Sequence, residues 1–141
     1  MLIKSYIITS LAIIISIGSF AQRTPFKLDQ KNPKSVVTAL FHAAQTNNYI
    51  ILGDICDPLD QGDGETKSIC ALAHSDDPEN KISRNEFTKL FIKGQVSGTI
   101  IYGNSNGYRT ANVPIRFGTD SNTEKNMKLV ERDGKWYLYS F

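Results

Sequence analysis

The chain has 141 residues, of which 40% are hydrophobic and 21% are charged, with 16 basic and 14 acidic side chains. This composition is ordinary for one globular domain, and it excludes a disordered chain, a collagen-like repeat and a coiled coil. The formal net charge of +2 leaves no basic excess that would point to nucleic acid or an anionic membrane as a partner.

The first 21 residues have the three-part layout of a secretory signal peptide. Lys4 supplies a positive charge, residues 6–17 form a mostly apolar stretch, and Ser19 and Ala21 are small residues before a cut at Gln22. A membrane anchor is the alternative, but this apolar run is shorter than the roughly 20 residues that spanning requires. We therefore expect an exported protein, periplasmic or extracellular, with no membrane span in its mature form of 120 residues and net charge +1.

The rest of the chain is predicted to hold an N-terminal extension, residues 22–31, and a single domain, residues 32–141. In an oxidising compartment its two cysteines, Cys56 and Cys70, are expected to form a disulfide. Closing a loop of about 15 residues stabilises a fold by about 3 kcal/mol. A redox or zinc role is disfavoured because the chain has no C-x-x-C motif and no nearby pair of histidines.

Charge is distributed unevenly along the mature chain. Residues 22–53 carry a net charge of +3, residues 54–79 carry −7, and residues 80–141 carry +5. Both cysteines lie in the acidic segment. We therefore expect a constrained acidic loop, residues 54–79, that projects from the fold.

Four acidic residues of this loop are weak candidates for calcium ligands: Asp57, Asp60, Asp63 and Glu65. The spacing does not fit an EF-hand, because aligning Asp63 with the fifth loop position puts Leu59 at the first and Cys70 at the last. A solvated turn whose aspartates cap the next helix is the favoured interpretation.

Helical spacing of apolar residues predicts four helices in the first part of the domain. Asn32 and Pro33 form a typical helix start, as do Asp77 and Pro78, and Gly94 is placed to end the last helix. The predicted helices cover residues 33–46, 49–55, 65–73 and 78–93.

After Gln95 the apolar period changes to two, which predicts strands over residues 95–103, 111–117, 126–132 and 135–141. Pro114 suggests that the second strand lies at an edge or carries a bulge. Asp133 and Gly134 predict a tight hairpin that pairs Leu129 with Leu138.

Both faces of this hairpin are rich in apolar groups, whereas a half-exposed antiparallel sheet alternates apolar with polar residues. One face carries Met127, Leu129, Trp136 and Leu138, and the other carries Val130, Tyr137, Tyr139 and Phe141. We expect one face to pack on the helices and the other to line a pocket or meet a partner. The candidate pocket or interface residues are Tyr102, Val130, Tyr137, Tyr139 and Phe141.

Helices followed by a sheet, together with the terminal run from Leu129 to Leu138 around Asp133-Gly134-Lys135-Trp136, resemble the nuclear-transport-factor-2-like superfamily, and most closely its small exported bacterial members. The resemblance spans residues 32–141 and implies N-terminal helices on a curved antiparallel β-sheet, with a conical pocket and often a homodimer. The segment bridged by Cys56 and Cys70 is additional to the common pattern. A cystatin-like sheet with one helix is the alternative fold, but four helical segments are too many for it.

Enzymes of this superfamily use a pocket carboxylate or histidine as a general base. Neither His42 nor His74 has supporting residues around it in the sequence, and no catalytic residue is assigned. Zinc motifs, glycine-rich phosphate loops and nucleophile elbows are absent, so no cofactor is expected. The preferred hypothesis is a non-catalytic domain that binds a small apolar ligand or a protein through its sheet. The alternatives are a small-molecule isomerase or hydrolase, and an envelope-associated protein that uses the acidic loop as its contact.

Overall fold

The computed structural model describes residues 25–141, and the predicted signal peptide lies outside the described residues. In this part of the chain four helices precede five strands, which confirms the predicted α+β class. The helices are α1 (Pro33–Thr46), α2 (Ile51–Ile55), α3 (Gly64–Ala71) and α4 (Arg84–Phe91). The strands are β1 (Gln95–Val96), β2 (Ile101–Ser105), β3 (Tyr108–Phe117), β4 (Thr123–Arg132) and β5 (Lys135–Ser140).

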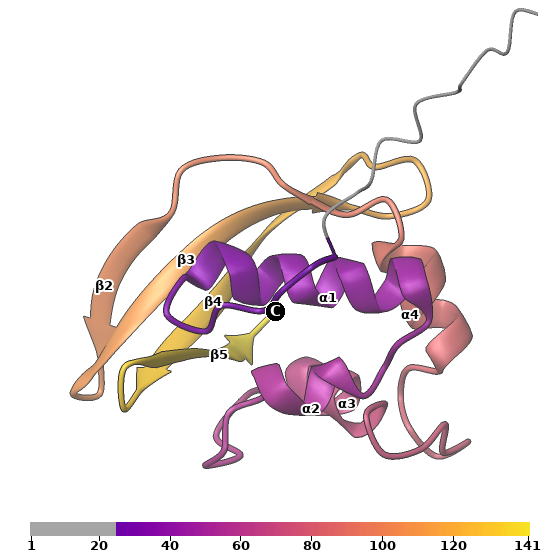
Figure 1. The fold of residues 1–141 in the computed structure, drawn as a ribbon, viewed down its shortest axis with the longest axis horizontal. Helices are drawn as coiled ribbons and strands as arrows, with labels where there is room; N and C mark the ends of the chain where they lie inside the picture. The colour runs from indigo at the N-terminus through magenta and orange to yellow at the C-terminus, as the bar shows by residue number, and fades with distance from the viewer. Residues whose placement is uncertain (1–24) are drawn as a thin grey trace, which may run out of the picture.

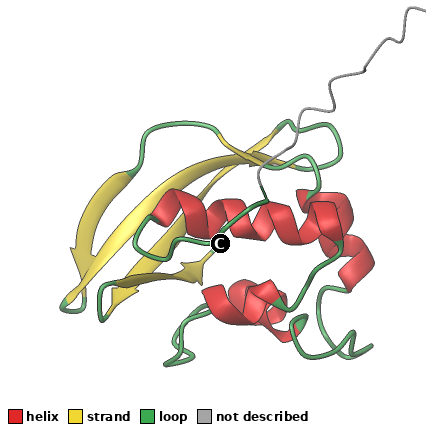
Figure 2. Cartoon of the chain, in the orientation of Figure 1, coloured by secondary structure: helices red, strands yellow, loops and turns green. Residues whose placement is uncertain are grey.

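Helix α1 lies along one face of the sheet, and the sheet bends around it (Figure 1). The side chain of Asn32 accepts a hydrogen bond from the Lys34 backbone N–H at 3.0 Å, and Asn47 ends the helix in the left-handed conformation. Val37 and Leu40 are fully buried in the core shared with the sheet. The predicted first helix is therefore confirmed at both ends, and Figure 2 shows the other helices on the same side of the sheet. None of the helices within residues 25–141 combines the length and apolar character needed to cross a membrane.

Helix α4 begins later than the sequence pattern predicts. Ser83 and Glu86 form a reciprocal capping box, in which each side chain accepts a hydrogen bond from the other residue's backbone N–H. The predicted start at Asp77 and Pro78 is wrong, because Asp77 instead accepts the N–H of Glu79 within a turn. The stronger cap at Ser83 decides where the helix starts.

The sheet is antiparallel, with strand order β1-β3-β4-β5, and β2 pairs with β3 on the same side as β1. The sequence pattern predicts one strand where the structure has β1 and β2, separated by residues 97–100. The Ser97 N–H donates to the Pro114 carbonyl. Because the N and the C=O of one strand residue point toward the same neighbouring strand, the Pro114 nitrogen, which has no hydrogen to donate, also faces this break. Pro114 therefore lies in a central strand and not in an edge strand. The neighbouring strand is the irregular one, because it is interrupted at residues 97–100.

The β4–β5 hairpin has the predicted register, with Leu129 opposite Leu138 and a tight turn at Asp133 and Gly134, both with positive φ. The register shifts between Lys128 and Leu129, so Lys128 faces Ser140. This bulge changes the face of the sheet on which the side chains at the end of the chain lie.

The segment 56–63 runs along the outer edge of β5. Cys56 forms a parallel bridge with Leu138, and the Asp63 N–H donates to the Tyr139 carbonyl at 3.0 Å. A Cβ on Gly62 would lie 3.0 Å from that same carbonyl, so glycine permits the close approach. The predicted disulfide is present and joins Cys56 to Cys70 in α3. One edge of the sheet is therefore covered by a cross-linked segment.

Reduction of Cys56–Cys70 is expected to lower the free energy of unfolding by about 3 kcal/mol, because the open chain gains entropy in the unfolded state. Denaturant titration of the oxidised protein and of the reduced, alkylated protein measures the difference. The double variant Cys56→Ala/Cys70→Ala should match the reduced protein and should not respond to reductant. Equal midpoints for the oxidised and reduced proteins would contradict the expectation.

Candidate ligand-binding groove

A groove opens between α3, α4 and the end of the chain after β5. Its inner part is a cavity of about 280 Å³, and a second hollow of about 480 Å³ continues it along α4. Both parts share Lys81, Ile82 and Leu90. We call the whole depression the α3–α4 groove, and its inner part is lined by Glu65, Ser68, Ile69, Lys81, Ile82, Leu90, Phe91 and Phe141.

The floor of the α3–α4 groove is aromatic and aliphatic. The ring of Phe141 lies 5.5 Å from that of Phe91 and 5.2 Å from that of Phe117, centroid to centroid. Phe91 and Ile69 are buried in the core beneath. Because these rings pack on each other and on the sheet, the floor is held in place without a ligand.

Phe141 reaches the groove because of the bulge in the β4–β5 hairpin. Strict alternation places it on the same face as Val130, Tyr137 and Tyr139, and that prediction is wrong. The extra residue at the bulge reverses the alternation, so Phe141 turns to the helix side and contacts Phe91. Asp63 fixes this position, since its Oδ2 accepts the Phe141 backbone N–H at 3.0 Å.

The rim of the α3–α4 groove carries two acidic and two basic side chains, and both acidic groups are engaged by other parts of the protein. Lys125 pairs with Glu65 at 3.2 Å and lies over the Phe141 ring, 4.2 Å from its centroid. Glu86 is engaged in the capping box of α4. Lys81 and Lys89 form no ion pair with any residue of 25–141, so their ammonium groups remain available to an incoming anion.

The acidic loop is bound to the fold at two points and does not project freely. At the first, Asp57 forms a two-point ion pair with Arg132, at 3.1 Å to Nε and 2.9 Å to Nη2, and both side chains are buried. Arg132 also lies against the ring of Tyr108, 4.1 Å from its centroid, and donates to Gln61. Its Nη1 is buried without a hydrogen-bond partner within residues 25–141.

Burial by itself would raise the pKa of Asp57. The hydrogen bonds from Arg132 and from the backbone N–H groups of Leu59 and Gln61, with the charge of Arg132, outweigh burial, and the pKa is lowered. The same charge-assisted contact raises the pKa of Arg132 against the effect of burial. The pair is therefore fully ionised at neutral pH.

Asp63 is the second attachment point of the loop. Its Oδ1 accepts the Thr66 N–H at 2.8 Å and caps α3, while its Oδ2 holds Phe141. Burial again works to raise the pKa of Asp63, but the hydrogen bonds from Thr66 and Phe141 lower it overall. This one carboxylate therefore joins the acidic loop, α3 and the groove floor.

The four candidate calcium ligands are not assembled into a site. Asp57 and Asp63 are engaged with Arg132 and Phe141, while Asp60 lies near Lys67 and Glu65 pairs with Lys125. Within residues 25–141 no group of three or more acidic, histidine or cysteine side chains is placed to hold a metal ion. The favoured interpretation of a helix-capping aspartate is confirmed for Asp63.

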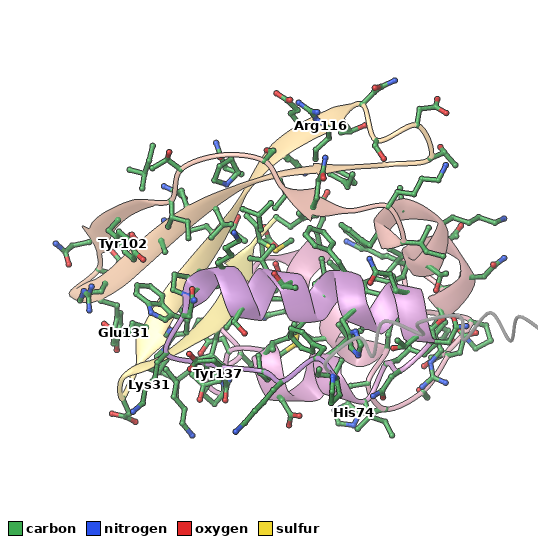
Figure 3. All side chains as sticks on the ribbon, turned by 45° about the horizontal axis from the view of Figure 1, so that its top comes forward. Lys31, His74, Tyr102, Arg116, Glu131 and Tyr137 are labelled. Atoms are coloured by element: carbon green, nitrogen blue, oxygen red, sulfur yellow. A yellow bond between two sulfur atoms is a disulfide. The ribbon has the colours of Figure 1, made fainter. Side chains whose placement is uncertain are left out.

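The five predicted pocket or interface residues are spread over both faces of the sheet. Tyr102 lies on the helix side, 5.9 Å from the Trp136 ring, whereas Tyr137 pairs with Val130 on the opposite face. Both tyrosines are labelled in Figure 3. Val130 and Tyr139 border a hollow of about 20 Å³, which has room for no more than a water molecule. Only Phe141 lines the α3–α4 groove.

Neither histidine contributes to the α3–α4 groove. His42 packs on Phe26 at 4.7 Å between ring centroids, and His74 is exposed in the turn after α3. Lys81 and Lys89 are not among the site residues predicted from the sequence. The available signal is that each lysine directly precedes an apolar residue, Ile82 or Leu90.

Asp57→Asn should lower the free energy of unfolding by about 3–5 kcal/mol, because it leaves the buried Arg132 charge without its partner. The matched control is Glu124→Gln, which breaks the exposed Arg116–Glu124 pair and should cost less than about 1 kcal/mol. Denaturant titration compares the two variants with the unaltered protein. Similar losses for both would show that burial does not distinguish the two pairs.

Stability should also depend on acid pH. Because the pKa values of Asp57 and Asp63 are lower in the folded than in the unfolded chain, their stabilisation is complete above about pH 5 and is lost as the pH falls through the folded values, below about 4. Asp63→Asn keeps a cap for α3 but removes one titrating group. Its melting temperature should therefore fall less steeply with acid than that of the unaltered protein, and an equally steep fall would refute the assignment.

Comparisons of the chain with models of known protein families, with curated proteins and with solved structures find no match.

Proposed function

We propose that this protein is an exported, non-catalytic domain of nuclear-transport-factor-2-like architecture that binds a small amphipathic anion in the α3–α4 groove. The ligand's apolar part packs on the groove floor, and its negatively charged head lies toward Lys81 and Lys89. A medium-chain carboxylate is the simplest molecule of this kind.

The observation that carries the proposal is an apolar floor beside two lysines without ion-pair partners in residues 25–141. Ile82, Leu90 and Phe141 are partly exposed and offer apolar surface, and burying such surface favours binding by about 25 cal/mol per Å². The cavity volume is at the small end of the range for ligand pockets, which suits a short chain rather than a large ring system.

The proposed export and fold have separate support. A disulfide is typical of proteins that mature outside the cytoplasm, and the signal-peptide pattern of residues 1–21 points the same way. Helices gathered on one side of a bent antiparallel sheet are the arrangement that the superfamily resemblance implies.

The enzymatic alternative has less support. It requires a general base that faces the groove, and the two carboxylates lining it in the described chain, Glu65 and Glu86, are engaged with Lys125 and with the start of α4. The acidic-loop alternative is weakened in the same way, because Asp57 is buried against Arg132 and the carboxylate of Asp63 is engaged by the backbone of Thr66 and Phe141.

Binding of octanoate and of octanol, measured by isothermal titration calorimetry, tests the proposal. We expect octanoate to bind more tightly than octanol, and Leu90→Gln to weaken both by about fivefold through the loss of apolar contact. Replacing both Lys81 and Lys89 with Gln should weaken octanoate by up to about tenfold and leave octanol unchanged.

Two control variants change similar side chains outside the groove. Ile50→Gln removes a 75% exposed apolar side chain before α2, and Lys34→Gln removes an exposed charge in α1. Both should bind octanoate as the unaltered protein does. Equal affinity for octanoate and octanol would contradict the proposal that the ligand has an anionic head group. Failure of both to bind would overturn the proposed function.

A further inference from the structure

The two edges of the sheet differ in how they are protected. The β5 edge is covered by the disulfide-linked segment 56–63. The opposite edge is formed by β1 and β2, and within residues 25–141 no strand pairs with the outer side of β2 (Figure 2). An exposed strand edge presents unpaired N–H and C=O groups and is a template for pairing with another strand.

The side chains of β2 do not protect this edge. Ile101 is 67% exposed and Tyr102 is 55% exposed, and they point to opposite faces of the sheet. Tyr102 lies toward the helix side near Trp136, and Ile101 is on the other face, opposite Asn112 in β3. Each face of β2 therefore offers one large apolar group at the free edge.

The edge also lacks the charges that normally prevent strand edges from pairing. The 15 residues from Gly94 to Tyr108 contain no charged side chain and no proline, whereas Lys93 and Arg109 bound the run on either side. Edge strands are commonly protected by lysine, proline or a bulge, and β2 has none of these along Ile101–Ser105. A neutral strand can lie beside an identical strand without like-charge repulsion.

We infer that β2 pairs antiparallel with β2 of a second copy of this chain, so that two five-stranded sheets join edge to edge. A two-fold axis perpendicular to the sheet generates such a contact, with the same residues on both sides. With the axis beside Ile101, the two Ile101 side chains lie opposite each other on the same face of the joined sheet. Because segment 56–63 covers β5, the pairing ends at two copies and does not continue into a filament.

A second copy suits this edge better than a charged partner does. Neutral apolar and hydroxyl groups give no attraction for nucleic acid or an acidic surface, and self-pairing needs no complementary charge pattern. This dimer is independent of the α3–α4 groove, which lies at α3 and α4 on other residues.

Sedimentation velocity across a wide concentration range tests the inference on the purified protein. We expect a monomer–dimer equilibrium that high salt does not weaken, since no ion pair holds the edge. Ile101→Lys should raise the dimer dissociation constant by at least about tenfold, because it brings two ammonium groups close together at the edge. Ile50→Lys, at the most exposed of the large hydrophobic residues away from β2, should leave the equilibrium unchanged.

A mixture of variants separates edge pairing from a general loss of apolar surface. Ile101→Lys and Ile101→Glu should each be monomeric alone, whereas their equimolar mixture should recover dimers at low salt. Circular dichroism and melting temperature confirm that both variants fold, as expected for a position this exposed. A monomer at all concentrations, a dimer unaffected by Ile101→Lys, or a mixture that stays monomeric would each overturn the inference.

Discussion

The carboxylate of Asp63 joins three parts of the molecule that lie far apart in the sequence. One oxygen caps α3 through Thr66, and the other holds the Phe141 backbone N–H at 3.0 Å. The N–H of Asp63 also donates to Tyr139, which keeps segment 56–63 on the β5 edge. The groove floor and the covered edge therefore depend on one residue, and the disulfide and the Asp57–Arg132 pair fix the chain on either side of it.

Local patterns predicted the elements whose ends are fixed by neighbouring residues. The cap of Asn32, the hairpin turn at Asp133 and Gly134 and the alternation along β3 are local, and each is present in the structure. The start of α4 was misplaced because two capping signals competed six residues apart, and the capping box at Ser83 satisfies two backbone N–H groups at once.

The site was harder to predict because its geometry depends on long-range contacts. A charge of −7 over residues 54–79 indicated a solvated loop, but the partners of Asp57 and Asp63 are Arg132 and Phe141, more than 70 residues away. A one-residue bulge then moved Phe141 to the other face of the sheet, which no alternation pattern can reveal. The sequence pattern correctly indicated an aromatic chain end and missed the face on which it lies.

The same acidic segment explains why an open strand edge is tolerable in this fold. A sheet with two free, neutral edges can add copies at both sides without limit, as in fibrous aggregates. Here the negative loop is bound by Arg132 and cross-linked by Cys56–Cys70, so it occupies the β5 edge through backbone contacts that another chain would otherwise make. Only β2 is left, and pairing at a single edge closes after two copies. The acidic segment 54–79 thus covers the β5 edge of the sheet, and the uncharged segment 94–108 forms the edge that is free to pair.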